Sequence, residues 1–340
     1  MVEADCQAVD LYGEPDKTLD SMTFGEYLES RNASHIAIQT ATVWTRAMLG
    51  QEPGDISALF FLQYCKAGGG LLQMRSDRKG GGQHLRMKQG TQFVAKSLVA
   101  GLPEGVVRLE ETVVAVRQLE GGRLSVQSTG GVYEAKKVIC AVPPTVLRDI
   151  TFEPPLPGKT AEALDSYKYG FYMKVMVRFR TPFWVEKGLC GLAQSFTGPA
   201  AIFRDTSVPT DGKHVLTCFM AGRPGVEWSK LAAEERKEAL LKQIGEVYDI
   251  GGRAGEEFVE LLDYQWPTDA FTGYGCPSPA LAPGALGEMG VDWTRPVGGV
   301  HFAGTEFSKV WRGYMEGAVR SGESVADEVL AEMAKAESKS

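Results

Sequence analysis

The residues of this chain best suited to chemistry lie between positions 301 and 318, near its carboxyl end. There an apolar, strand-like segment runs into Gly304–Glu306, and the segment Trp311–Ala318 follows as a glycine-rich helix opening. Small residues allow a ligand to approach the backbone closely, so that N–H groups meet a phosphate or the edge of a cofactor ring. The pattern therefore predicts a ligand-binding turn.

Two other residues have unusual surroundings. Lys174 stands in the apolar, aromatic segment Gly170–Val175. A lysine inside such a strand usually protects a sheet edge or extends its ammonium to the surface. Cys276 lies in the glycine- and proline-rich loop Gly273–Gly284. A thiolate in such a loop can add to an electron-poor ring.

The elements that must position these residues are a mixture of helices and strands. Thr23 and Glu26 have the spacing of a capping box within a helical region that we expect over Thr18–Gly68. The hydrophobic periodicity predicts further helices and strands. Three helices are expected: one that starts near Gly90, a second over Glu234–Val247, and a third from Gly313 to about Ala334. The expected strands are Val106–Arg117, Leu124–Gln127, Lys136–Val142 (buried), Tyr172–Phe179 and Val215–Met220. The order of elements indicates an α+β chain rather than strict βαβ alternation.

Composition excludes several functions. The 340 residues carry a net charge of -7, and the pI of about 5.4 leaves no basic stripe for nucleic acid or an anionic membrane. No run of eighteen apolar residues predicts a membrane helix, and the polar N-terminus does not read as a secretory signal. The six cysteines have no C-x-x-C spacing, so we expect reduced thiols in an intracellular, soluble protein, cytoplasmic or peroxisomal, and no metal.

The two carboxyl-terminal segments closely resemble the signature of the flavin-containing monoamine oxidase family, and the resemblance covers Leu19 to about Leu330. It implies an FAD cofactor and a site for an amine. The residues at the family's FAD-binding positions are Val113, Ala141, Trp266, Cys276, Gly304, Thr305, Glu306 and Met315. Those at its catalytic and substrate positions are Lys174, Tyr314 and Gln83.

The resemblance also implies roles. Lys174 corresponds to a lysine that holds a water against the flavin N5, and Pro182-Phe183-Trp184 follows it as in the family. Cys276 corresponds to the cysteine that animal members bond to the flavin, whereas other members hold FAD without a bond. Tyr314 matches one wall of an aromatic cage for the amine. The other wall is normally an aromatic residue, and here that position is Pro277.

Alternatives remain for several of these positions. Val138–Pro144 and the strand around Val113 also read as ordinary buried strands. The Gly-Gly-Gln run that ends at Gln83 also reads as a chance loop, and Trp266 as a structural core residue. The sequence does not decide whether Arg86 or Arg204 faces the pocket, as an amino-acid substrate would require.

One family feature is missing. No G-x-G-x-x-G turn, which would receive the FAD pyrophosphate, occurs in the sequence. We therefore interpret the chain as a family member without its N-terminal third, and expect strand Val138–Val142 to present an apolar edge that favours pairing with another chain. The predicted fold is α+β (α/β), with an incomplete FAD/NAD(P)-binding-type domain (88–163 and 269–332) and a substrate domain of mixed sheet and helices (1–87 and 164–268).

Two functional hypotheses follow. The first is FAD-dependent oxidation of an amine to an imine and then an aldehyde, with O2 reduced to hydrogen peroxide. Its partners would be a small-molecule amine and O2, and neither nucleic acid nor a membrane is expected. The apolar edge of strand Val138–Val142 is compatible with a homo-oligomer. The second is an inactive fragment that cannot retain FAD and acts, if at all, as a binding or assembly partner.

Overall fold

The computed structural model describes residues 1–208, 210–290 and 294–338. The chain folds into two compact units, each of which contains separate stretches of sequence. Unit 1 consists of Met1–Asp16, Phe61–Ser166 and Ala285–Ser340, and unit 2 consists of Lys17–Phe60 and Tyr167–Gly284. The division falls within helix α5 (Ala58–Ala67). The four-segment domain division predicted from the sequence stays a prediction.

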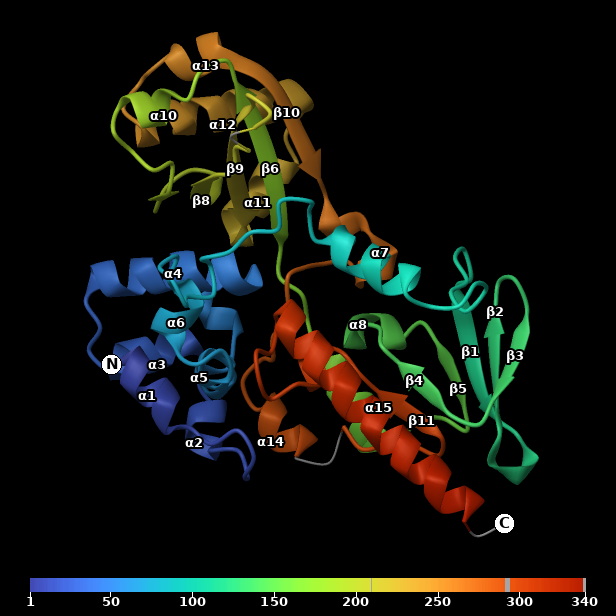
Figure 1. Ribbon diagram of the computed structural model, residues 1–340. Coiled ribbons are helices and arrows are strands. Elements are labelled where there is room, and N and C mark those ends of the chain that lie inside the picture. Colours follow the sequence, from blue (N-terminus) through green and yellow to red (C-terminus); the bar gives the residue numbers. More distant parts are fainter. Residues whose placement is uncertain (209, 291–293, 339–340) are drawn as a thin grey trace. The chain divides into compact units, whose positions relative to one another are not determined.

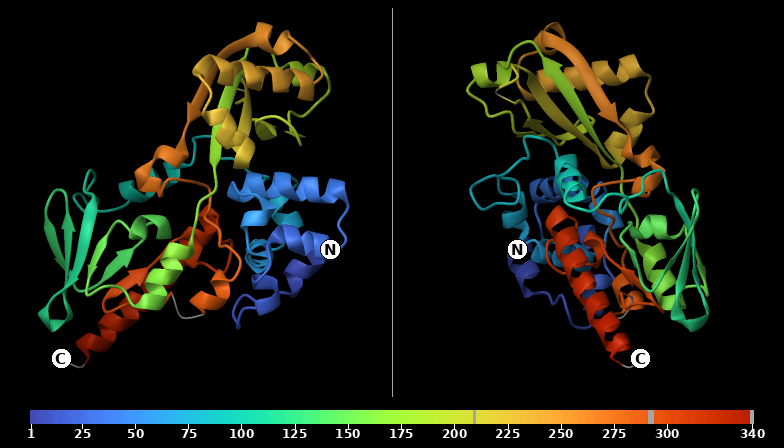
Figure 2. Two further views of the ribbon diagram at one scale, coloured as in Figure 1. Left: turned by 180° about the vertical axis from the view of Figure 1, so that it is seen from behind. Right: turned by 45° about the vertical axis from the view of Figure 1, so that its right-hand side comes forward.

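Unit 1 contains two small sheets and the long C-terminal helix (Figure 1). Its strands are β1 (Val113–Gln118), β2 (Leu124–Ser128), β3 (Val132–Ala135), β4 (Val138–Cys140), β5 (Thr151–Glu153) and β11 (Val300–Phe302). Four of them form a sheet in the order β3-β2-β1-β5, and β4 pairs in parallel with β11. Helix α15 (Met315–Glu337) lies against β11 and is drawn in red in Figure 2.

The remaining elements of unit 1 are short. They are α1 (Val2–Ala8), α6 (Leu71–Arg75), α7 (Gln92–Ala100), η2 (Glu120–Gly122), α8 (Pro144–Leu147), α9 (Gly158–Ser166), α14 (Ala285–Met289) and η5 (Thr305–Phe307). Helix α7 has no buried residue, and Leu98 on it is 66% exposed. The large apolar residues Phe93 and Val99 of this helix are exposed as well.

Unit 2 is built on a five-stranded sheet in the order β10-β6-β9-β8-β7, in which neighbouring strands run antiparallel. Its strands are β6 (Tyr172–Phe179), β7 (Ala193–Gln194), β8 (Ala200–Asp205), β9 (His214–Ala221) and β10 (Phe258–Tyr264). Alternate residues of β6 are buried, from Met173 to Phe179, because successive side chains of a strand point to opposite faces. They form a core with Trp184, Trp228 and Leu240.

Helices cover this sheet and extend unit 2 (Figure 1). They are α2 (Lys17–Asp20), α3 (Phe24–Ser30), α4 (His35–Leu49), η1 (Pro53–Asp55), α10 (Phe183–Glu186), α11 (Gly222–Ser229), α12 (Ala233–Val247), α13 (Arg253–Glu257), η3 (Trp266–Thr268) and η4 (Ala270–Thr272). The predicted capping box is confirmed: the Glu26 N–H donates to Thr23 Oγ1 at 3.1 Å, and the Thr23 N–H donates to Glu26 Oε2 at 2.8 Å.

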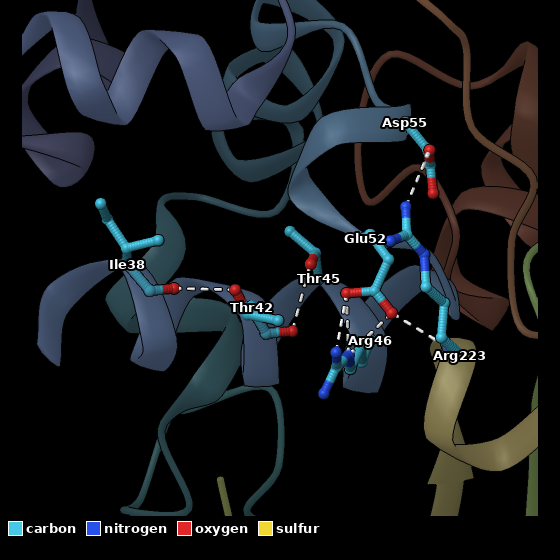
Figure 3. A network of polar contacts seen from close by, with 7 residues as sticks. All are labelled: Ile38, Thr42, Thr45, Arg46, Glu52, Asp55 and Arg223. Carbon is cyan, nitrogen blue, oxygen red and sulfur yellow. Dashed lines mark hydrogen bonds and ion pairs between the residues drawn. The ribbon is translucent and has the colours of Figure 1, made fainter. Parts of the chain in front are cut away.

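A polar network fixes the end of α4 against the start of α11 (Figure 3). Arg46 Nε donates to both oxygens of Glu52, at 2.9 and 3.0 Å, and the Arg223 N–H donates to Glu52 Oε1 at 2.9 Å. Gly222, with φ 63°, leaves room for this contact, since a Cβ there would lie 2.6 Å from Glu52 Oε1. Buried charges are stable when paired in this way.

Three predicted boundaries are wrong. The strand predicted from Val106 begins only at Val113, because Glu110 has φ 61° and interrupts the extended chain. The strand predicted as buried over Lys136–Val142 pairs only over Val138–Cys140, and Ile139 on it is 43% exposed. Helix α15 begins at Met315 rather than Gly313, because Tyr314 is extended and Gly313 has φ 82°.

Candidate active site

The carboxyl ends of β4 and β11 meet at one edge of their two-stranded sheet. Phe302 is in register with Cys140, and the Ala303 N–H donates to the Cys140 carbonyl at 3.0 Å. Ala141 and Gly304 therefore leave the sheet at the same edge, and Ala141 is exposed. This is the edge of a parallel sheet at which ligands bind in α/β proteins.

Gly304 turns the chain sharply at this edge. Its φ is 141°, in the range that favours glycine, and its N–H donates to Ser321 Oγ at 3.2 Å. Glu306 folds back beneath the turn and is only 5% exposed, and burial raises the pKa of its carboxyl. The turn is closely packed, since a Cβ on Gly304 would lie 3.1 Å from Glu306 Oε2.

The loop from Thr305 to Tyr314 is closed by one hydroxyl. Thr305 Oγ1 accepts a hydrogen bond from the Gly313 N–H at 2.6 Å and donates to the Tyr314 carbonyl at 2.9 Å. Gly317 packs onto the same point, since a Cβ there would lie 2.8 Å from Thr305 Oγ1 and 2.3 Å from the Trp311 carbonyl oxygen. These contacts explain the spacing of the glycines in the Trp311–Ala318 segment.

Tyr314, the residue just before α15, is the aromatic residue that contacts both Tyr64 and Trp311. Its ring lies 6.4 Å from the Tyr64 ring with an interplanar angle of 27°, and 5.2 Å from the Trp311 ring in an edge-on arrangement. Its phenol hydrogen-bonds with Tyr64 and Gln83, and burial raises its pKa to about 12. Tyr314 is therefore a neutral, oriented aromatic surface at physiological pH.

Gln83 and Trp311 are themselves held in place. Gln83 Nε2 donates to the Met74 carbonyl at 3.1 Å. A Cβ on Gly82 would lie 3.1 Å from that carbonyl and 3.4 Å from the Trp311 ring, so the glycine pair before Gln83 allows a close approach. Trp311 has φ 54° and donates its N–H to the Ala67 carbonyl at 2.7 Å. A bulky residue in this conformation is rare and is often found at functional sites.

The sequence analysis missed three members of this group: Tyr64, Trp311 as a ring partner, and Arg75. Tyr64 reads as one more apolar position of a buried helix, and Arg75 reads as part of a solvated basic run. In the structure the Arg75 guanidinium interacts electrostatically with Tyr314 and Cys65, and burial lowers its pKa to about 10. The only signal in the sequence was the nearness of Arg75 to Gln83.

Unit 2 brings together Lys174, Trp266 and Cys276. On β6, Lys174 is in register with Tyr264 of β10 and Phe219 of β9, and its ammonium lies 5.7 Å from the centre of the Phe219 ring. The Tyr264 ring in turn lies 4.6 Å from the Trp266 ring. Because β6 lies between β10 and β9, Lys174 does not protect a sheet edge, but its side chain is exposed, in agreement with the alternative that it extends to the surface.

Cys276 lies close enough to Lys174 for their charges to interact, and its thiol donates to the Tyr172 carbonyl at 3.7 Å. Burial raises the pKa of the thiol to about 12, and Lys174 opposes this shift. The thiol is therefore protonated at neutral pH in this environment, and a covalent link between Cys276 and the flavin stays a prediction.

The other predicted residues lie on separate elements. Val113 begins β1, where the register with β2 shifts between Val113 and Ala115. Met315 is the first residue of α15 and is 50% exposed. No side chain at the preceding position caps this helix, so its first N–H groups are donors that a ligand can use.

The site thus combines a glycine turn at the carboxyl ends of parallel strands, a helix start without a side-chain cap and a stacked pair of tyrosines in an α+β protein. A turn and a helix start of this kind are typical of proteins that bind a phosphate-bearing cofactor. The comparisons with known proteins agree. Residues 9–330 match the family described as flavin containing amine oxidoreductase. The chain belongs to this family of flavin-containing enzymes, whose cofactor is FAD.

Similar proteins are found by sequence and by structure. The chain is 34% identical to the putative flavin-containing monoamine oxidase AofH of Mycobacterium tuberculosis, over 93% of its own length and 67% of that protein. It is 32% identical to the flavin-containing amine oxidase B of Homo sapiens, over 93% of its length and 60% of the human protein. The match thus spans about two thirds or less of the length of these relatives.

Solved structures of the same kind superpose closely. Cyclohexylamine oxidase from Brevibacterium oxydans IH-35A gives a TM-score of 0.88 at 26% identity, covering 98% of this chain and 73% of that one. A redesigned variant of putrescine oxidase gives a TM-score of 0.87 at 25% identity, covering 97% and 72%. Among the described residues, no helix is long and apolar enough to cross a membrane.

Proposed function

We propose that this protein takes part in the FAD-dependent oxidation of a primary or secondary amine. The amine loses two electrons and two protons to give an imine, which water hydrolyses to an aldehyde and, for a primary amine, ammonia. O2 takes up the two electrons and two protons and leaves as hydrogen peroxide. FAD, when bound, supplies the redox chemistry that no side chain can provide.

The observation that carries the proposal is the fixed Tyr314 ring. Tyr64, Gln83 and Trp311 hold it in one orientation, at the start of the helix that follows the Gly304 turn. An electron-rich face of this kind orients an amine and excludes water from the reacting carbon. Because Pro277 stands where the family has its other aromatic residue, the Tyr64–Tyr314 stack supports a substrate surface built differently from the usual cage.

Arg75 adds a condition on the substrate's charge. Its pKa of about 10 keeps the guanidinium positive at neutral pH, beside Tyr314. A fixed cation repels an ammonium group, so the neutral amine is the form that enters. No side-chain base is then required to remove a proton from the bound amine.

Lys174 and the Gly304 turn have supporting roles in this proposal. Lys174 holds a water with its ammonium, among the rings of Phe219 and Tyr264. The turn at Gly304, with Thr305, Glu306 and Met315, holds the cofactor's phosphate-bearing arm, and Val113 and Ala141 face its nucleoside half. Trp266 lies near Lys174, because its ring contacts that of Tyr264, the cross-strand neighbour of Lys174.

A specific observation favours the second hypothesis, an inactive chain that acts through binding. In the part of the chain that the structure describes, β4 and β11 form a parallel sheet of two strands. Parallel sheets are normally buried on both faces by further elements. With Ile139 and most of α7 exposed, the cofactor-binding unit has apolar surface that another chain can cover.

One experiment separates the two functions. The purified protein is incubated with FAD and desalted, its visible spectrum is recorded, and peroxide release is then followed with benzylamine, cyclohexylamine and putrescine. Retained flavin together with peroxide release that is lost in Tyr314→Ala supports the oxidase. A colourless protein that releases no peroxide rejects the oxidase and leaves the binding role.

A further inference from the structure

Unit 1 contains a cluster of polar side chains where α15 packs against β11, apart from the group around Tyr314. His301 of β11 is completely buried, with 0% of its side chain exposed. Its Nδ1 lies 3.5 Å from Glu328 Oε2, and its Nε2 lies 3.5 Å from Glu332 Oε2. Neither ring nitrogen makes a hydrogen bond to a described residue, because these oxygens lie outside hydrogen-bonding geometry.

A buried imidazole without a hydrogen bond is unfavourable. Leaving a buried polar group unsatisfied costs about 1–3 kcal/mol, and natural proteins rarely tolerate it without a reason such as a bound ion. His301 lies within the apolar strand segment Val300–Ala303, where a hydrophobic residue would pack without this cost. The residue type therefore indicates a polar role for His301 together with the two carboxylates beside it.

The surrounding geometry is that of a cation site. Glu328 and Glu332 are four residues apart on α15 and so project from the same face of the helix. One ligand atom from each of the three side chains can be chosen so that all lie within 4.8 Å of one another. Ligands around a tetrahedral Zn²⁺ at about 2.0–2.2 Å lie roughly 3.4 Å apart, so the two carboxylates, which face different nitrogens of the His301 ring, turn toward one nitrogen when the ion binds.

The donors also select the kind of cation. An imidazole with two carboxylates suits Zn²⁺ and similar transition metals, whereas Mg²⁺ and Ca²⁺ prefer oxygen ligands alone. The Glu328 and Glu332 side chains are 46% and 38% exposed, so water reaches the cluster and can complete the coordination. Glu332 also lines an open groove of about 720 Å³ that carries Arg123, Lys136 and Lys335. These positive charges repel cations, so a cation stays at the cluster only if the three side chains coordinate it directly.

We propose that His301, Glu328 and Glu332 form a binding site for a divalent transition-metal cation of the Zn²⁺ type. The site is separate from the Tyr314 group and joins β11 to α15. Lys137, just before β4, occupies part of it, because its ammonium forms an ion pair with Glu332. Metal binding and the Lys137–Glu332 pair therefore compete for one carboxylate.

The test uses Zn²⁺ itself, with the full chain in a Cys190→Ser background, since Cys190 is the exposed cysteine of the chain. Chelator-treated protein is dialysed against a Zn²⁺ series, and bound metal is measured by elemental analysis. We expect one Zn²⁺ per chain at saturation, with affinity weakened at least about tenfold by Glu328→Gln or Glu332→Gln. Glu323→Gln, an exposed change on the same helix, is the matched control and leaves the affinity unchanged.

Lys137→Met provides the sharper test, because it removes the competing ammonium. We expect it to tighten Zn²⁺ binding about two- to fivefold, the value of a surface ion pair. The proposed site is overturned if Zn²⁺ binding is not saturable, or if Glu328→Gln and Glu332→Gln bind Zn²⁺ as tightly as the unchanged chain. It is also overturned if Lys137→Met leaves the affinity unchanged or weakens it. Far-UV circular dichroism establishes that each variant is folded.

Discussion

The Tyr64 and Tyr314 rings stack at 6.4 Å with an angle of 27° between their planes, although 250 residues separate them in sequence. Tyr64 comes from α5 and Tyr314 from the residue before α15. The hydrogen bond between their side chains links the phenol of Tyr314 to a buried helix. The orientation of the proposed substrate surface thus depends on packing within unit 1.

The first prediction concerns the ring of Tyr314. Tyr314→Phe keeps the stack and loses the hydroxyl contacts, so we expect kcat/KM for benzylamine to change by less than about threefold. Tyr314→Ala removes the stack, which is worth roughly 0.5–1.5 kcal/mol beyond area burial, and we expect a loss of about tenfold or more. Flavin content is measured on both variants. Equal losses in the two variants would contradict a role for the aromatic face.

The second prediction compares two glycines of α15. Gly317→Ala places a Cβ 2.3 Å from the Trp311 carbonyl oxygen, and backbone cannot move aside easily. We expect a loss of about 1–3 kcal/mol in unfolding free energy. Gly322→Ala on the same helix has no atom within 4 Å of the new Cβ, and we expect it to stabilise the protein by about 0.5–1 kcal/mol. Urea unfolding of both variants measures the difference, and the prediction fails if the two shifts have the same sign.

The third prediction concerns pH and Glu306. Burial raises the pKa of this carboxyl in the folded protein, so the folded state binds the proton more tightly than the unfolded state. Its contribution to stability is therefore present in full below the unfolded pKa and is lost as pH rises through the folded pKa. We expect Glu306→Gln to raise the melting temperature at pH 7–8, with the gain disappearing near pH 4. A variant whose gain is independent of pH would show that ionisation is not involved.

The fourth prediction concerns the link between Cys276 and the cofactor. Because burial raises the pKa of this thiol to about 12 and Lys174 offsets only part of the shift, the thiolate is scarce at neutral pH. We expect flavin to stay in the supernatant after acid precipitation of FAD-loaded protein, in the native chain and in Cys276→Ser alike. Yellow colour in the native pellet that is absent from the Cys276→Ser pellet would demonstrate a covalent bond at this residue.

The sequence by itself determined the elements with strong local signals. The Thr23–Glu26 capping box, strand β6 over Tyr172–Phe179 and helix α12 were predicted nearly to the residue, because caps and hydrophobic periodicity act within a few residues of the chain. The family was also evident from the Gly304–Glu306 and Trp311–Ala318 segments, since close packing of glycines restricts what can stand there.

Only the tertiary structure decided which side chains meet. Tyr64 and Arg75 were indistinguishable from a core residue and a loop charge until folding placed them beside Tyr314. The protonation of Cys276 depends on burial, which no local pattern reveals. Glu328 and Glu332 follow His301 by 27 and 31 residues in sequence. They approach it only because α15 packs on β11. Contacts between distant segments and the loss of solvent around them are properties of the packed chain, and these decide the chemistry of the side chains.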